Sequence, residues 1–145
     1  MAQPIGKAEY EKLASFRYAL RQFMHFSEAA AREAGITPRQ HQALLAIAGL
    51  PGRDEAMMSE LAERLQLRHH STVELIDRLV AHGLVARESG VEDRRQVYVS
   101  LTPEGHEMLA RLSVAHREEL KRIGPQLNLL LAELTTIDDP EADQL

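Results

Sequence analysis

The sequence predicts a mainly helical chain that carries one short β-hairpin. Two long stretches near its ends place apolar residues at the helical spacing of three and four positions. Residues 97–101 instead alternate apolar and polar side chains, as a half-buried strand does. The 145 residues are 44% apolar and 27% charged, which suits one folded domain over residues 1–145. Cysteine is absent, which excludes disulfides and thiolate metal sites.

The N-terminal third predicts two helices joined by a tight turn. Residues 7–34 contain neither glycine nor proline, and Gly35 is a residue type that ends helices in a left-handed conformation. Thr37 followed by Pro38 is typical of a helix start, so a second helix is expected through Ala48. The apolar positions that set the period of the first helix are Leu13, Phe16, Leu20 and Phe23.

Two further helices are expected in the middle of the chain. Ser59 is expected to cap a short helix over residues 60–65. After a tight turn, a longer helix is expected over residues 68–81, and Gly83 ends it.

The second half predicts a hairpin and then a long helical region. Residues 84–87 are expected to pair with the strand 97–101, with residues 89–93 as the hairpin tip. Thr102-Pro103 repeats the helix-start pattern. Gly124-Pro125 is expected to break or kink that helix before a last one.

A short helix, a tight turn, a longer helix and a hairpin follow one another in the order of a winged helix-turn-helix. At 100° per residue, the helix 68–81 separates an apolar face from a polar face. Side chains of these polar types can hydrogen-bond to base edges or to phosphates. Glu74 could accept a hydrogen bond from a cytosine, or it could pair with Arg78 one helical turn further on. If the helix stood alone, this polar face would instead be interpreted as an ordinary solvent-exposed surface. The polar face comprises His70, Ser71, Glu74 and Arg78.

The charge distribution permits a nucleic-acid partner despite a net charge of −5. Residues 64–95 hold six arginines against five acidic residues, or +1, so the remainder of the chain carries −6. The basic side chains are therefore concentrated where the predicted helix-turn-helix and hairpin lie.

Three motifs within residues 58–105 are more specific. They are Ser59-Glu60-Leu61-Ala62, then Asp77-Arg78-Leu79 followed by Gly83-Leu84-Val85, and finally Asp93-Arg94-Arg95 leading to Leu101-Thr102-Pro103-Glu104-Gly105. Together they resemble the multiple antibiotic resistance regulator (MarR) family of bacterial transcription factors.

This resemblance implies a homodimeric DNA-binding regulator, usually a repressor, that meets a palindromic double-stranded operator. It implies dimerisation helices over 7–34 and 103–137, and a winged-helix DNA-binding region over 38–102 with two or three strands. The wing is then expected in the minor groove beside the recognition helix. The first and last helices carry more apolar side chains than one DNA-binding region could bury, so these residues are expected at the dimer interface. They are Leu13, Phe16, Leu20, Leu112, Leu127, Leu130, Leu131 and Leu134.

The resemblance also implies which residues contact DNA. The wing arginines of the family match Arg94 and Arg95, although either could instead brace the hairpin by pairing with Asp93 or Asp77. The run Arg68-His69-His70 departs from the usual small polar cap, so no relative's operator sequence can be assumed. The residues expected to contact DNA are Arg68, His69, His70, Ser71, Glu74, Arg78, Arg94 and Arg95.

The resemblance also implies a small effector, such as a phenol, in the cleft beside the dimerisation helices. Phe16, Phe23 and His41 are the candidate contacts, while an aromatic stripe at helical spacing is also typical of plain core. No cofactor or metal ligand set is expected, because the seven histidines lack ligand spacing. No enzymatic motif is present either.

Two other functions remain open at this point. One is a winged-helix module that binds only other proteins, and the other is a metal-responsive regulator. With no apolar run long enough for a membrane span and no signal pattern at the N-terminus, a cytoplasmic protein is expected.

Overall fold

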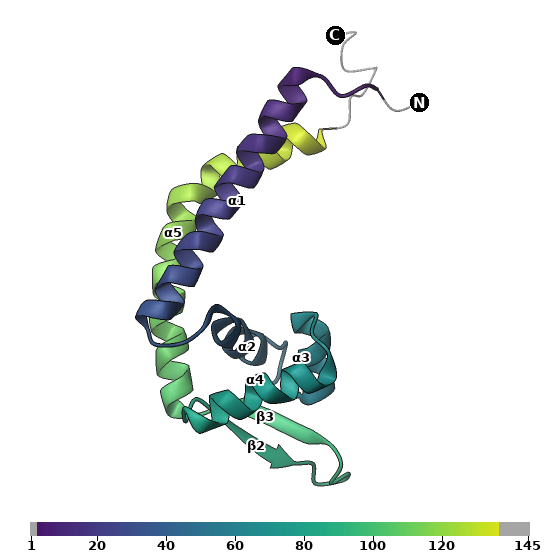
Figure 1. Cartoon of the computed structure of the whole chain (residues 1–145), viewed down its shortest axis with the longest axis vertical. Coiled ribbons are helices and arrows are strands. Elements are labelled where there is room, and N and C mark those ends of the chain that lie inside the picture. Colours follow the sequence, from purple (N-terminus) through teal and green to yellow (C-terminus); the bar gives the residue numbers. More distant parts are fainter. Residues whose placement is uncertain (1–2, 137–145) are drawn as a thin grey trace. The chain divides into compact units, whose positions relative to one another are not determined.

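The computed structural model describes residues 3–136 and confirms a mainly helical chain with a small antiparallel sheet (Figure 1). None of its helices within this range combines the length and apolar character needed to cross a bilayer. The elements in chain order are α1 (Lys7–Glu33), α2 (Pro38–Ala48), β1 (Glu55–Met57), α3 (Met58–Leu65), α4 (His69–Ala81), β2 (Val85–Ser89), β3 (Val97–Leu101) and α5 (Pro103–Thr135).

The chain forms two compact units. The lobe consists of residues 27–115, and the helical unit, within the described residues, consists of residues 3–26 with 116–136. The boundaries fall inside the two long helices, so α1 and α5 each contribute a segment to both units.

The lobe encloses the hydrophobic core. Helices α2, α3 and α4 pack with a three-stranded sheet of order β1-β3-β2, in which both pairings are antiparallel. The central strand places Val99 opposite Ala56 on one side and Arg87 on the other. The largest fully buried apolar side chains come from all three helices and β3, namely Leu44, Ile47, Leu61, Ile76, Leu79 and Val99.

Three helices of the lobe end in the same way, with a residue of positive φ. Gly35 and Gly83 have φ values of 89° and 73°, as the sequence predicts for helix-ending glycines. After Gly35, for example, the amide of Ile36 donates to the carbonyl of Ala31 at 3.1 Å. Gln66 occupies the equivalent position after α3 with φ 55°, which is uncommon for a residue with a side chain.

The start of α3 differs from the prediction. The helix begins at Met58, and Ser59 lies inside its first turn rather than capping it. Glu60 supplies the cap instead, because its carboxylate accepts from the amide of Met57 at 3.0 Å. A carboxylate three residues after the cap position can reach back in this way and also suits the positive end of the helix dipole.

Helix α5 is continuous through Gly124-Pro125, so the prediction of a separate last helix is wrong. A proline inside a helix removes one backbone donor and crowds the preceding turn, which costs stability without necessarily ending the helix. Residue 137, the expected end of the dimerisation helix, lies outside the described residues.

Within the helical unit, the segments of α1 and α5 run antiparallel. Lys12 lies 3.8 Å from the carboxylate of Glu133, whereas Phe23, further along α1, meets the earlier residue His116. The rings of Phe23 and Phe26 contact His116 edge-on, with centroids 5.9 and 5.5 Å away. Such contacts between aromatic rings add to the burial energy of the side chains.

The start of α5 is anchored closely to the turn between α4 and β2. The amide of Thr102 donates to the carbonyl of Leu84 at 3.0 Å, and its hydroxyl donates to the carbonyl of Gly83 at 2.6 Å. The same hydroxyl accepts from the amide of Gly105 at 3.1 Å. An ideal Cβ at Gly105 would lie 2.0 Å from the carbonyl oxygen of Leu84, so glycine is required there.

We expect Gly105→Ala to lower the free energy of unfolding by at least about 2–3 kcal/mol, because rigid backbone atoms oppose the added methyl group. Gly124→Ala is the matched control. Apart from its two chain neighbours and the nearby backbone of its own helix, no described atom lies within 4 Å of its added Cβ, so alanine should change the free energy of unfolding by less than about 1 kcal/mol. Urea denaturation of both variants measures the effect, and equal stabilities would contradict the close approach.

Candidate nucleic-acid interface

Helix α4 is held by the turn that precedes it. The amide of Leu67 donates to the carbonyl of Ala62 at 2.9 Å, which fixes the exit from α3. The carbonyl of Arg68 then accepts from the amide and the hydroxyl of Thr72, at 3.0 and 2.9 Å. Thr72 is fully buried, so its hydroxyl is satisfied within the helix while its methyl group packs inward.

The two faces of α4 are as the sequence predicts. Thr72, Ile76 and Leu79 are fully buried against the lobe core. The opposite face is open, with Ser71 half-buried and Glu74 exposed. The other predicted DNA-contact residues of this helix and its N-terminus are also exposed, namely Arg68, His69, His70 and Arg78.

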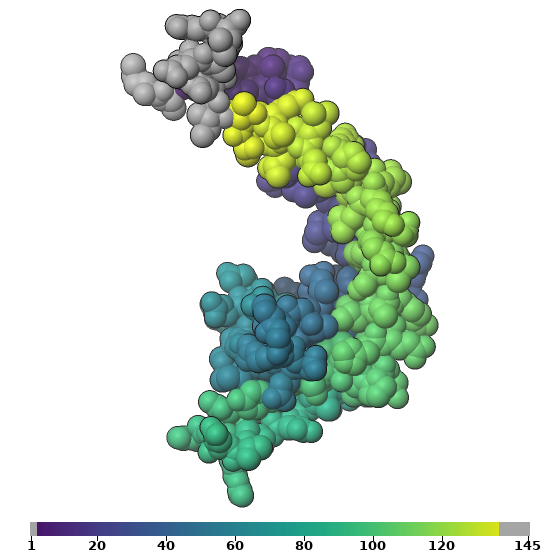
Figure 2. Space-filling model, turned by 180° about the vertical axis from the view of Figure 1, so that it is seen from behind, coloured from purple at the N-terminus to yellow at the C-terminus, as the bar shows by residue number. Residues whose placement is uncertain are grey.

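The hairpin tip between β2 and β3 is shaped by Asp93. Its carboxylate accepts from the amide of Arg95 at 3.0 Å, and its backbone carbonyl accepts from the amide of Gln96 at 3.1 Å. The amide of Gly90 closes the tip by donating to the carbonyl of Gln96 at 2.8 Å. Figure 2 shows this tip as a narrow projection from the lobe.

The two wing arginines differ in their partners. The Nε of Arg95 lies 3.3 Å from the Asp93 carboxylate, yet 93% of the Arg95 side chain is exposed. Arg94 is exposed and has no ion pair within residues 3–136. Of the ion pairs considered for bracing the hairpin, the one between Arg95 and Asp93 is therefore present. Asp77 pairs instead with Arg87 of β2.

The Asp77–Arg87 ion pair joins α4 to the wing. Both side chains are nearly half exposed, so this pair contributes little to stability. Because Asp77 pairs with Arg87, it does not pair with the next residue, Arg78, which is exposed on the polar face.

The carboxylate of Glu60, at the start of the helix-turn-helix, has two hydrogen-bond partners. Besides its cap to Met57, the carboxylate pairs with the guanidinium of Arg53. The hydrogen bond from Arg53 and then the amide of Met57 lower the pKa of Glu60 below its ordinary value. The sequence alone does not reveal this pair, because Arg53 lies in an irregular turn seven residues away.

The predicted effector contacts lie in different units. Phe16 and Phe23 are half-buried on α1 within the helical unit. His41 lies on α2 within the lobe, where it is 3% exposed. Leu112, expected at a dimer interface, is instead buried in the lobe core. Among the described residues, no three histidine or acidic side chains are close enough together to hold a metal ion.

Three helices and a hairpin in this arrangement define a winged helix-turn-helix protein. The model of the MarR family matches residues 34–96, which include α2, β1, α3, α4 and the wing tip. The predicted resemblance to this family is therefore confirmed over the segment 34–96.

The chain is similar to known transcriptional regulators. The chain is 37% identical over 71 residues to the HTH-type transcriptional repressor MdtR of Bacillus subtilis, a match that covers 49% of this chain and 44% of MdtR. AbsC, a MarR family transcriptional regulator from Streptomyces coelicolor, has a TM-score of 0.74 at 23% identity, covering 99% and 97% of the two chains.

A DNA-bound structure is also similar. It is a mutant of S. aureus MepR bound to an oligodeoxyribonucleotide, with a TM-score of 0.66 at 17% identity over 90% of this chain and 87% of that one. At such identities, AbsC and MepR show a shared fold. The chain spans about half the length of the curated relatives it matches.

We expect Glu60→Ala to lower the free energy of unfolding by about 1 kcal/mol at neutral pH through loss of the α3 cap. Glu60→Gln keeps an acceptor for Met57 and should cost less. Because folding lowers the pKa of Glu60, its charged form stabilises the protein above the unfolded pKa, and this stability is lost as the pH falls through the folded value. Denaturant titrations at neutral and acidic pH should therefore show the gap between wild type and Glu60→Gln closing in acid. A constant gap would contradict the pairing.

Proposed function

We propose that this protein is a homodimeric, sequence-specific DNA-binding transcriptional regulator that acts in the cytoplasm as a repressor. The division of α4 into two faces carries the proposal. Its inner side is fixed by Thr72, Ile76 and Leu79, all fully buried, so the helix cannot rotate without emptying the core. The outward face therefore presents a constant row of hydrogen-bonding side chains, as reading base edges requires.

The wing supports the same function. Arg94 and Arg95 lie at the exposed end of a narrow hairpin, where they can enter a minor groove beside the helix. A narrow minor groove concentrates negative potential and attracts arginine. The DNA-bound MepR mutant shows that a protein of this fold can bind DNA.

Dimerisation is supported by apolar side chains of the helical unit that this chain leaves exposed. Tyr10 is 59% exposed, Met24 51% and Leu129 60%. Their burial against a second copy would remove a substantial apolar area from water. Two copies of α4 about 34 Å apart would then meet successive major grooves of a palindromic site.

Release by a small effector completes the proposal. Phe16, Phe23 and His41 remain the proposed contacts for a phenolic ligand. Such a ligand would reduce DNA affinity by favouring a conformation in which the two α4 helices no longer match the groove spacing.

The experiment that tests this function is selection of bound duplexes from a random pool, followed by affinity measurements from 50 to 200 mM salt. We expect a palindromic sequence and an affinity that falls steeply with salt. Recovery of no sequence and no salt slope would support a protein-binding module instead. Selection only in the presence of added zinc would support a metal-responsive regulator, and a single unrepeated site would contradict the dimer.

The wing assignment predicts that Arg94→Ala and Arg95→Ala each weaken binding to all duplexes, on the order of tenfold at low salt. The slope of log affinity against log salt should fall by about one unit for each phosphate that is no longer neutralised. Arg111→Ala, an exposed cation on α5, removes the same charge elsewhere and should change neither quantity. Wild-type affinity in both wing variants would place the wing away from DNA.

The base-reading role of α4 predicts a different outcome for Ser71→Ala. The hydroxyl can pair with a base edge, so discrimination at one position of each half-site should fall by about 1–3 kcal/mol. Binding to random duplex should remain near wild type, because the variant keeps every cationic side chain that can meet a phosphate. Competition between the selected and random duplexes measures this, and equal losses on both would refute base reading.

A further inference from the structure

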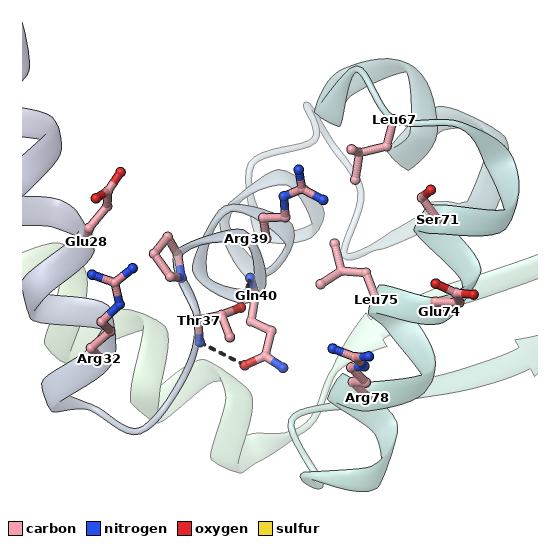
Figure 3. Close-up of a pocket in the computed structure, with 11 residues that line it drawn as sticks. Glu28, Arg32, Thr37, Arg39, Gln40, Leu67, Ser71, Glu74, Leu75 and Arg78 are labelled. Carbon is pink, nitrogen blue, oxygen red and sulfur yellow. Dashed lines mark hydrogen bonds between the residues drawn. The ribbon is translucent and has the colours of Figure 1, made fainter.

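A hollow of about 550 Å³ lies beside α4 within the lobe (Figure 3). Its wall on one side is the end of α1, its floor is the first turn of α2, and its other wall is α4. Three of its lining residues, Ser71, Glu74 and Arg78, belong to the polar face already described. The hollow is therefore continuous with the proposed base-reading surface.

Three guanidinium groups surround the hollow, each from a different helix. Figure 3 shows Arg32 of α1 on one side, Arg78 of α4 on the other, and Arg39 of α2 between them. All three arginines are exposed, and none has an ion pair within residues 3–136. With Glu28 and Glu74 as the acids of the lining, the formal charge of the hollow is +1.

Of these three arginines, only Arg39 has no acidic residue on its own helix that could neutralise its charge. Glu28 precedes Arg32 by four positions, and Glu74 precedes Arg78 by four, a spacing that lets a carboxylate neutralise an arginine on its own helix. Helix α2 contains no acidic residue at all. Arg39 is thus available to an outside anion.

The backbone beneath Arg39 is fixed. The hydroxyl of Thr37 accepts from the amide of Gln40 at 3.1 Å, and the amide of Thr37 donates to the Gln40 side chain at 3.0 Å (Figure 3). Gln40 itself is only 4% exposed, which ties the turn to the core. This turn therefore holds the Cα of Arg39 at a defined place beside α4.

The dimensions of DNA indicate which part of the duplex would face the hollow. An α-helix with its side chains is about 10–12 Å across, and the major groove is about 12 Å wide. A helix in the groove fills it, so the surface directly beside the helix faces the bordering sugar–phosphate strand. The hollow is such a surface.

We propose that this hollow receives the sugar–phosphate strand at one border of the major groove, with Arg39 and Arg32 as phosphate contacts that carry no sequence information. The inference rests on the proposed function and adds a third contact region, on α2 and the end of α1, to those of α4 and the wing. These contacts would set the depth and direction of α4 in the groove, while α4 itself supplies the specificity.

The test is the affinity of Arg39→Ala, Arg32→Ala and Arg39→Lys for a random-sequence duplex and for the selected one, across the same salt range. We expect either alanine variant to lose on the order of tenfold on both duplexes, and the salt slope to fall by about one unit. Arg39→Lys should restore most of the affinity, because either cation neutralises a phosphate and releases its counterion. Arg111→Ala should again match wild type. Thermal unfolding of each variant should be unchanged, since these side chains are exposed.

Ethylation interference locates the contact. Wild type should be blocked by ethylation of particular phosphates at the groove border, and Arg39→Ala should lose sensitivity at one of them in each half-site. Unchanged affinity and an unchanged interference pattern for Arg39→Ala would overturn the inference, while the steep salt slope of wild type would leave the proposed function standing. Absence of any salt-dependent DNA binding by wild type would instead remove the proposed function itself.

A small anion is the competing occupant of the hollow. Calorimetric titration of benzoate into the DNA-free protein provides that arm of the test. Benzoate binding that disappears in Arg39→Ala, with DNA affinity unaffected, would assign the hollow to a small carboxylate and overturn the phosphate contact.

Discussion

The burial of one side of α4 is the constraint on which the rest of the lobe depends. Thr72, Ile76 and Leu79 fill positions in the core that no other orientation of the helix could fill, and a buried Leu or Ile of this kind is worth several kcal/mol. The same burial determines where Ser71 and Arg78 point. The burial energy that stabilises the lobe therefore also orients the proposed DNA-reading surface, and no additional interaction is needed to keep that surface exposed.

The parts of this fold that could be predicted from sequence are those where one residue type has one conformational role. Gly35 and Gly83 end helices because a left-handed residue is needed there, and Pro38 begins one because its φ suits the first turn. The two faces of α4 follow from helical periodicity alone. Strand β1 could not be read this way, since the alternation over Glu55–Met57 is too short to distinguish a strand from a loop.

Three features of the structure could not be predicted from the sequence. Ser59 is a good capping residue, but Glu60 reaches the amide of Met57 and pairs with Arg53 as well, and this second interaction depends on the tertiary fold. Pro125 is an unfavourable residue for a helix interior, yet α5 continues through it. Arg39 is one of 17 basic residues, and its position in the chain does not reveal that the fold places it beside α4.

The positions of individual arginines decide how a chain of net charge −5 can present a cationic surface. In the lobe, Asp77 is paired with Arg87, Asp93 with Arg95, and Glu60 with Arg53. Outside the lobe, Glu118, Glu119 and Glu133 also face cations, and screening at physiological salt limits their reach to about 8 Å. The arginines that remain unpaired within residues 3–136 include Arg32, Arg39, Arg78 and Arg94, which lie around the hollow and at the wing tip. An ion pair removes one positive and one negative charge together, so the positive charge at the hollow and the wing tip comes from where the unpaired arginines lie.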